Sequence, residues 1–251
     1  FIDRLLEDYA DEWLTKAMFH YRWAYPADIK KAGSILPRWH AISTPEEQVV
    51  GMSQWISERQ VSRLSYVGSN ETTKPVIEES FKRFIQLLDK HLEQQPFLMG
   101  QRPGSSDFAV YGQLTCLALF DPTPQALILE HAPRVYAWTE VLEDLSGYQV
   151  SDTDWTDIDQ PPESLKGILS EVGRLYTPYM IANAQAVMSK AERVEVTLDG
   201  KPWQQNPFPY QAKCLMWLRE AYQALSDADR TRVDRVLGDT GLQELFSAET
   251  L

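Results

Sequence analysis

Apolar residues recur at intervals of three and four through most of this sequence. Such spacing places them on one face of an α-helix, whereas a half-buried β-strand would alternate apolar and polar residues. Between Ile2 and Trp23 the pattern predicts one long helix with an aromatic face. The two adjacent rows that we expect on this face contain Leu5, Leu6, Tyr9, Ala10, Trp13, Leu14, Ala17, Met18, His20, Tyr21 and Trp23.

Further helices have recognisable beginnings. Thr44 is followed by Pro45 and then by Glu47, which predicts a helix with Thr44 as its N-cap residue and proline in its first turn. Ser226 and Asp229 predict a second capping box before the last helix. The other expected helices cover residues 75–92, 105–120, 124–130, 133–145, 161–191 and 215–225.

The segment from Ser105 to Phe120 is apolar on more than one face, starting with Phe108. A helix with little polar surface belongs inside a domain rather than at its edge. We therefore expect this helix at the centre of a helical domain.

One short stretch has the alternation of a strand. Val194, Val196 and Leu198 alternate with polar residues and precede Asp199-Gly200, a favoured two-residue hairpin turn. The sequence therefore predicts an all-α protein with one β-hairpin near residues 194–204. A polar, aspartate-rich segment near residues 146–160 separates a predicted helical domain (1–147) from a mostly helical extension (148–251).

The charge balance argues against one class of partner. The chain has 24 Lys and Arg against 36 Asp and Glu, a formal net charge of −12, and its basic residues are spread along the whole length. Because a negative field repels polyanions, we expect neither nucleic acid nor an anionic membrane surface as a partner. The longest apolar stretch is also shorter than the roughly 18 residues of a membrane-spanning helix.

No familiar catalytic or metal-binding pattern occurs. The four histidines lie in separate elements, and Cys116 and Cys214 lack the paired spacing of a metal site, so we expect no metal and two reduced thiols. The sequence also has no glycine-rich phosphate loop and no nucleophile turn of the G-x-S-x-G type. We therefore predict no catalytic residue in this chain.

The most specific pattern is a junction between a loop and a helix, Pro-Phe-Leu-Met-Gly-Gln-Arg-Pro-Gly-Ser-Ser-Asp-Phe at residues 96–108. Asp107 takes the third helical position, where a carboxylate can accept from the N-cap amide and complement the helix dipole. The segment resembles the C-terminal domain of glutathione transferases, in which an aliphatic-Gly loop precedes a Ser/Thr-x-x-Asp capping box. Gly104 replaces the usual hydroxyl residue, and we expect Gly104 and Asp107 to act in folding rather than in catalysis.

This resemblance extends over about residues 1–147 and implies a helical bundle of the glutathione transferase type. The family's thioredoxin-like N-terminal domain, which holds the co-substrate glutathione and supplies the catalytic residue, is absent from this chain. Residues 148–251 look like the C-terminal extension of certain long bacterial members. By analogy, the first helix faces the substrate site, so Tyr9, Trp13, His20 and Tyr21 are candidates for binding a small hydrophobic electrophile. The alternative is that these side chains belong to the core or to a subunit interface.

Two functions follow from the resemblance. In the first, the chain is the helical half of a glutathione transferase-like protein, which we expect to be a cytoplasmic homodimer, and it is inactive without the missing domain. In the second, it is a non-catalytic interaction module built on the same domain. An unrelated helical bundle is a third alternative.

Overall fold

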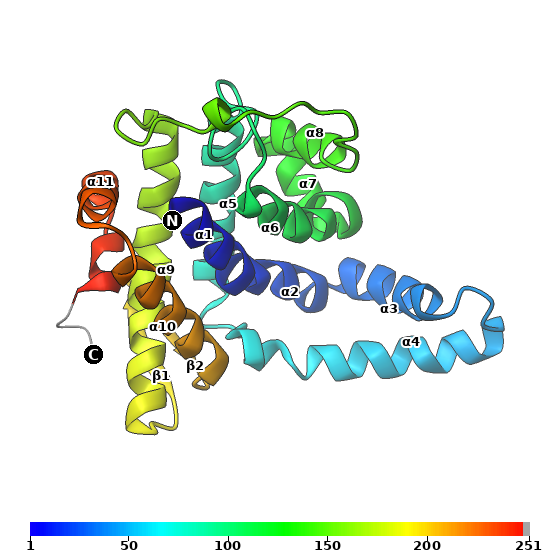
Figure 1. The fold of residues 1–251 in the computed structure, drawn as a ribbon. Helices are drawn as coiled ribbons and strands as arrows, with labels where there is room; N and C mark the ends of the chain where they lie inside the picture. Colours follow the sequence, from blue (N-terminus) through cyan, green and yellow to red (C-terminus); the bar gives the residue numbers. More distant parts are fainter. Residues whose placement is uncertain (248–251) are drawn as a thin grey trace.

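A computed structural model describes residues 1–247 of the chain. The protein is all-α, apart from one antiparallel hairpin, which is the only sheet in the described part (Figure 1). The first part of the chain forms α1 (Ile2–Tyr9), the π-helical turn η1 (Ala10–Leu14), α2 (Thr15–Ala24), α3 (Pro26–His40), α4 (Glu46–Val61), the 3₁₀ turn η2 (Leu64–Val67), α5 (Lys74–His91), α6 (Ser105–Leu114), the π-helical turn η3 (Thr115–Phe120), α7 (Pro122–His131) and α8 (Pro133–Val141).

The second part begins with the 3₁₀ turn η4 (Asp152–Asp154) and the long helix α9 (Glu163–Ser189). The hairpin then pairs β1 (Val194–Leu198) with β2 (Lys201–Gln205), so that Leu198 lies opposite Lys201. Asp199 and Gly200 have φ values of 51° and 73°, as the tight turn between twisted strands requires. The chain continues through α10 (Pro209–Gln223), α11 (Asp227–Leu237) and the 3₁₀ turn η5 (Leu242–Phe246).

The predicted first helix is present as the continuous run of α1, η1 and α2. It ends before Pro26, because Tyr25 takes the extended conformation that a following proline favours. The predicted hairpin, the long helix α9 and the Ser226 cap are also confirmed: the Ser226 hydroxyl accepts from the Asp229 amide at 3.1 Å.

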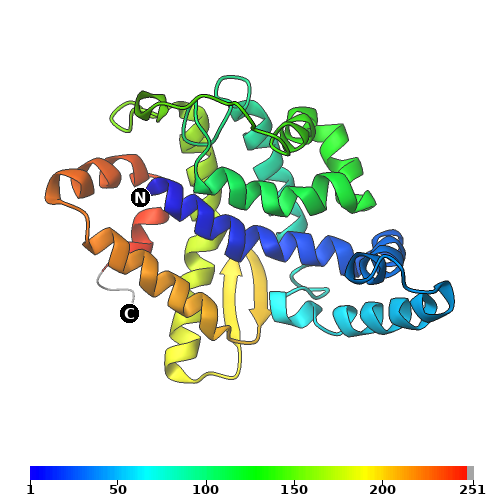
Figure 2. The same cartoon turned by 45° about the vertical axis from the view of Figure 1, so that its right-hand side comes forward.

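Helices α3 and α4 form an arm that projects from the rest of the molecule (Figures 1 and 2). The expected N-cap at Thr44 is wrong: α4 begins at Glu46, its N-cap is Pro45 in an extended conformation, and no side chain caps its first amides. The rigid φ of Pro45 therefore precedes the helix instead of lying in its first turn.

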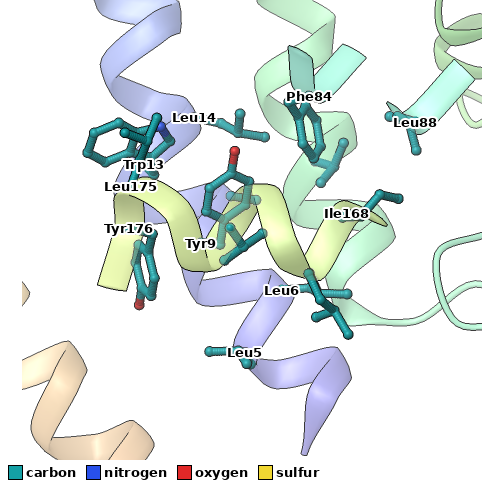
Figure 3. Close-up of a cluster of buried hydrophobic side chains, with 14 of the residues drawn as sticks. Leu5, Leu6, Tyr9, Trp13, Leu14, Phe84, Leu88, Ile168, Leu175 and Tyr176 are labelled. Carbon is teal, nitrogen blue, oxygen red and sulfur yellow. The ribbon is translucent and has the colours of Figure 1, made fainter. Parts of the chain in front are cut away.

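The core is formed where α1 and η1 pack against α5, α6 and α9. Figure 3 shows Tyr9 between Phe84 of α5 and Tyr176 of α9, with ring centroids 5.5 and 5.9 Å from that of Tyr9. The buried cluster is continuous from α1 to η5 and therefore crosses the predicted boundary near residues 146–160. The division into two domains stays a prediction.

The expectation of an enclosed helix at residues 105–120 is only partly right. Val110, Leu114 and Leu117 are buried, but Phe108 is 51% exposed. The segment forms α6 followed by η3, and α6 packs mainly against α1 and η1 on one face while its Phe108 side faces solvent. Within residues 1–247, no helix combines the length and apolar character needed to cross a bilayer.

Candidate functional site

The four side chains proposed for substrate binding are Tyr9, Trp13, His20 and Tyr21, and all are buried, with 4% or less of their surface exposed. Tyr9 packs in the core between α5 and α9. The Trp13 indole donates to Ser80 Oγ at 3.3 Å, and Tyr21 packs against Phe81 at a centroid distance of 5.5 Å. The structure thus places them in the core, in agreement with the alternative interpretation of their spacing, and their role in substrate binding stays a prediction.

His20 joins two polar side chains from distant segments. Its Nδ1 lies 2.8 Å from Ser69 Oγ and its Nε2 lies 3.0 Å from Glu78 Oε1. Glu78 also accepts from the Tyr25 hydroxyl. Burial alone raises the pKa of Glu78, but the hydrogen bonds from His20 and Tyr25 outweigh it, and the net pKa is lowered.

A serine, a histidine and a carboxylate that are hydrogen-bonded in series have the connectivity of a nucleophilic triad. Ser69, however, is 6% exposed, which denies a substrate carbonyl the approach that attack requires. The nearest amides are also occupied: Ser69 N donates to Leu64 O and Asn70 N donates to Thr73 Oγ1, each at 3.0 Å, so neither can stabilise an oxyanion. This cluster therefore joins α2, α5 and the loop after η2 as a structural network.

The junction before α6 has the expected capping by Asp107. Its carboxylate accepts from Gly104 N and Leu98 N, both at 2.8 Å, which holds the loop against the start of the helix. Burial raises the pKa of Asp107 to about 7, and the two amides oppose that rise.

The missing N-cap hydroxyl is replaced from another helix. Asp3 of α1 accepts from the amides of Ser105 and Ser106 at 3.0 and 3.1 Å, and also from the hydroxyl of each serine. A Cβ at position 104 would approach Asp3 Oδ1 to 2.3 Å, so Gly104 makes room for this carboxylate. In place of a hydroxyl at the N-cap position, the carboxylate of Asp3 therefore caps α6, and this contact connects α1 to α6.

Lys16 is a buried residue that sequence reasoning missed. Its Nζ lies among the rings of Trp13, Tyr179 and Trp203, and the residue is 2% exposed. A signal was available, since Lys16 follows Trp13 by three residues and precedes His20 by four, and therefore lies on the predicted buried face.

A largely apolar cavity of about 510 Å³ opens beside the start of α1. Its lining combines residues from both parts of the chain and includes three charged residues, Asp3, Asp229 and Arg232. Trp155 is 38% exposed there, and the guanidinium of Arg102 lies 4.7 Å from its ring centroid. The apolar side chains of the wall are Phe1, Ile2, Met99, Trp155, Ile158, Leu225 and Val233.

This cavity can hold a small apolar molecule, and the polar residues of its lining are Asp3, Thr156, Asp229 and Arg232. Among residues 1–247, no three His, Cys, Asp or Glu side chains are grouped as a metal ion requires. Both cysteines are free thiols.

Comparison with known families identifies the helical part. Residues 55–145 match the family described as glutathione S-transferase, C-terminal domain. Over these residues the chain is similar to a glutathione transferase C-terminal domain. The match runs from within α4 to just past α8 and includes Gly104 and Asp107, whereas α1–α3 and the extension lie outside it. Searches among curated proteins and among solved structures found no match.

Proposed function

We propose that this chain is the helical, electrophile-binding half of a glutathione transferase-like protein that conjugates glutathione when joined to a thioredoxin-like domain. The match to the C-terminal domain supports the family assignment. The observation that carries the binding role is the apolar cavity beside Phe1. A thioredoxin-like domain attached at Phe1 would adjoin this cavity. A glutathione thiolate held by that domain would then be close to an electrophile bound in the cavity.

The chemistry then divides between the two halves. The attached domain would lower the pKa of the glutathione thiol, and the helical domain would hold the electrophile near it. Such positioning needs an apolar wall, which the cavity has. The two free cysteines agree with a reducing, cytoplasmic location, which we include in the proposal.

Trp155 provides the test, because its ring forms an exposed part of the cavity wall. Titration calorimetry of this chain with 1,3-dinitrobenzene, an unreactive analogue of chloronitroarene electrophiles, should show saturable binding. Trp155→Ala should weaken the affinity about tenfold, close to the 1.4 kcal/mol that a lost aromatic contact can cost. Trp217→Ala removes a similarly exposed ring outside this cavity and should leave the affinity unchanged.

Equal affinities in the two variants would contradict the assignment of the cavity. At the level of the whole protein, the form that carries a thioredoxin-like domain should bind immobilised glutathione and conjugate a general electrophile. Failure of both measurements would remove the transferase proposal.

The arm favours a homodimer as part of this proposal. The two helices of the arm carry net charges of opposite sign. If two arms lie antiparallel, α3 of one copy lies against α4 of the other, and the two helices attract each other. The apolar side chains Trp39, Ile42, Val50 and Trp55 are each more than half exposed on the arm. Helix α3 has Lys30, Lys31 and Arg38 against one acidic residue, Asp28, whereas α4 has Glu46, Glu47 and Glu58 against one basic residue, Arg59.

The same arm supports the second candidate, a non-catalytic interaction module, if another protein covers it. Sedimentation equilibrium distinguishes the two. A homodimer should have twice the 28.8 kDa mass of one chain, and Val50→Glu on the arm should make it monomeric. Val141→Glu, at a similarly exposed position on α8, should leave the dimer intact. A monomer at all concentrations would favour the module.

A further inference from the structure

We propose that the amine of Lys16 makes the attachment of the C-terminal extension to the helical domain depend on pH, because proton uptake at its Nζ opposes the packing of α9 and the β-hairpin against α2.

The amine lies where separate parts of the chain meet. Its Nζ donates to Val67 O at 3.4 Å, to the Tyr179 hydroxyl at 3.1 Å and to Gln205 Oε1 at 3.2 Å. Val67 ends η2, whereas Tyr179 belongs to α9 and Gln205 to β2. Two of its three acceptors therefore come from the extension, and Lys16 loses both if the extension moves away.

The surroundings solvate an ammonium only in part. Nζ lies 4.2 Å from the ring centroid of Tyr179, and 5.9 and 5.7 Å from those of Trp13 and Trp203. Ring faces and neutral acceptors favour the charged form. Among the described residues, however, no carboxylate forms an ion pair with Lys16. Burial is the stronger effect and lowers the pKa of Lys16 to about 7, although the charge of Glu12 opposes it.

The other charged and polar groups near Nζ come from η1, η2, α9 and β2. From η1 the facing charge is Glu12, and from α9 the titratable group is Tyr179; η2 and β2 contribute the neutral acceptors named above. On α10, Gln211 accepts from the Tyr179 hydroxyl, and Cys214 donates to Glu12 at 3.6 Å. Burial raises the pKa of both Tyr179 and Cys214, so neither loses its proton near neutral pH.

Lys16 is 2% exposed, so its Nζ has almost no contact with solvent while the extension stays in place. A Cβ at Gly68 would approach Gln205 Oε1 to 2.4 Å and Trp203 Cζ2 to 2.7 Å, so the hairpin packs directly against the loop after η2. Figure 2 shows the hairpin between α9 and this end of the arm. Hydration of the ammonium therefore requires the hairpin to separate from the helical domain.

The sign of the pH effect follows from proton linkage. An exposed lysine has a pKa near 10.4, so between about pH 7 and 10 the opened state binds a proton that the packed state lacks. The attachment therefore strengthens as the pH rises through this range. Below about pH 7 both states are protonated, and the full cost of burying the charge is present.

Hydrogen exchange measures this attachment directly. After correction for intrinsic exchange rates, the opening constant of amides in β1 and β2 should fall about 50-fold between pH 7 and pH 9, as two pKa values of about 7 and 10.4 require. Amides of α8, which lies away from Lys16, serve as the reference within the same molecule and should change little.

Two variants and one control complete the test. Lys16→Met removes the amine and should abolish the 50-fold change, whereas Lys30→Met, at an exposed lysine of α3, should keep it. Gln205→Glu places a carboxylate beside Nζ and should also flatten the profile, since the charge is then paired in the packed state. A wild-type profile that is flat, or one that persists in Lys16→Met or in Gln205→Glu, would overturn the proposal. If Lys16→Met does not fold, wild type and Gln205→Glu decide the outcome.

Discussion

Replacing Asp121 by alanine should lower the free energy of unfolding by about 3–5 kcal/mol, the range seen when one partner of a buried ion pair is removed. Asp121 is fully buried and accepts two hydrogen bonds of 3.0 Å from Arg22 Nε, with Arg22 Nη2 at 2.9 Å. Burial raises the pKa of Asp121 to about 6, which still leaves both partners charged at pH 7. The variant would leave the guanidinium buried without its counter-charge.

Urea denaturation followed by circular dichroism measures this change. Asp152→Ala is the matched control, because Asp152 pairs with Arg102 at 3.2 Å on the surface and should leave the urea midpoint unchanged. The double variant Arg22→Met/Asp121→Leu should recover most of the loss, since an apolar pair of similar volume can replace a buried ion pair. A loss below about 1 kcal/mol for Asp121→Ala would show that the pair is not buried as described.

Gly173→Ala should also destabilise the protein, by about 2–3 kcal/mol, although alanine is the better helix former. Gly173 lies within α9, and a Cβ there would approach the backbone oxygen of Thr240 to 1.9 Å and Leu242 N to 3.1 Å. Because the obstacle is backbone, the segment that leads into η5 must move. Exposure of η5, measured by hydrogen exchange, should accompany the loss of stability.

A second glycine in a helix gives the opposite expectation. A Cβ at Gly112 of α6 would meet no atom within 4 Å, so Gly112→Ala should raise stability by up to about 1 kcal/mol through helix propensity alone. Equal effects of the two substitutions would contradict the close approach at Gly173.

Local patterns were sufficient for most of the secondary structure. The spacing of apolar residues located the helix from Ile2 to Trp23 and the long helix α9, and Asp199-Gly200 located the hairpin, because each signal lies within a few residues. The arm helix α3 was missed. Its residues form no continuous apolar stripe, since much of the arm faces solvent.

Contacts between distant residues could not be predicted. Asp3 caps α6 across about 100 residues of sequence, and nothing near Gly104 indicates that partner. The first-helix aromatics had the spacing of a buried face, but spacing alone does not distinguish a core from a binding wall, and the structure places them in the core. The apolar cavity combines residues from both ends of the chain and had no sequence signal at all.

The π-helical turn η1 has a consequence for how this protein can change length. A step of four residues in an α-helix turns about 40° beyond a full circle, so a row such as Leu5, Tyr9, Trp13, Ala17 and Tyr21 would wind around a regular helix. The π-helical turn at Ala10–Leu14 has more residues per turn, so it offsets part of this rotation and helps to keep the row on one face. Because a π-helical turn accommodates one extra residue, deleting one residue there would restore regular helical geometry and leave the direction of the residues beyond it nearly unchanged. A one-residue deletion within the regular helix α1, by contrast, would rotate everything beyond it by about 100° and turn Lys16 and His20 outward.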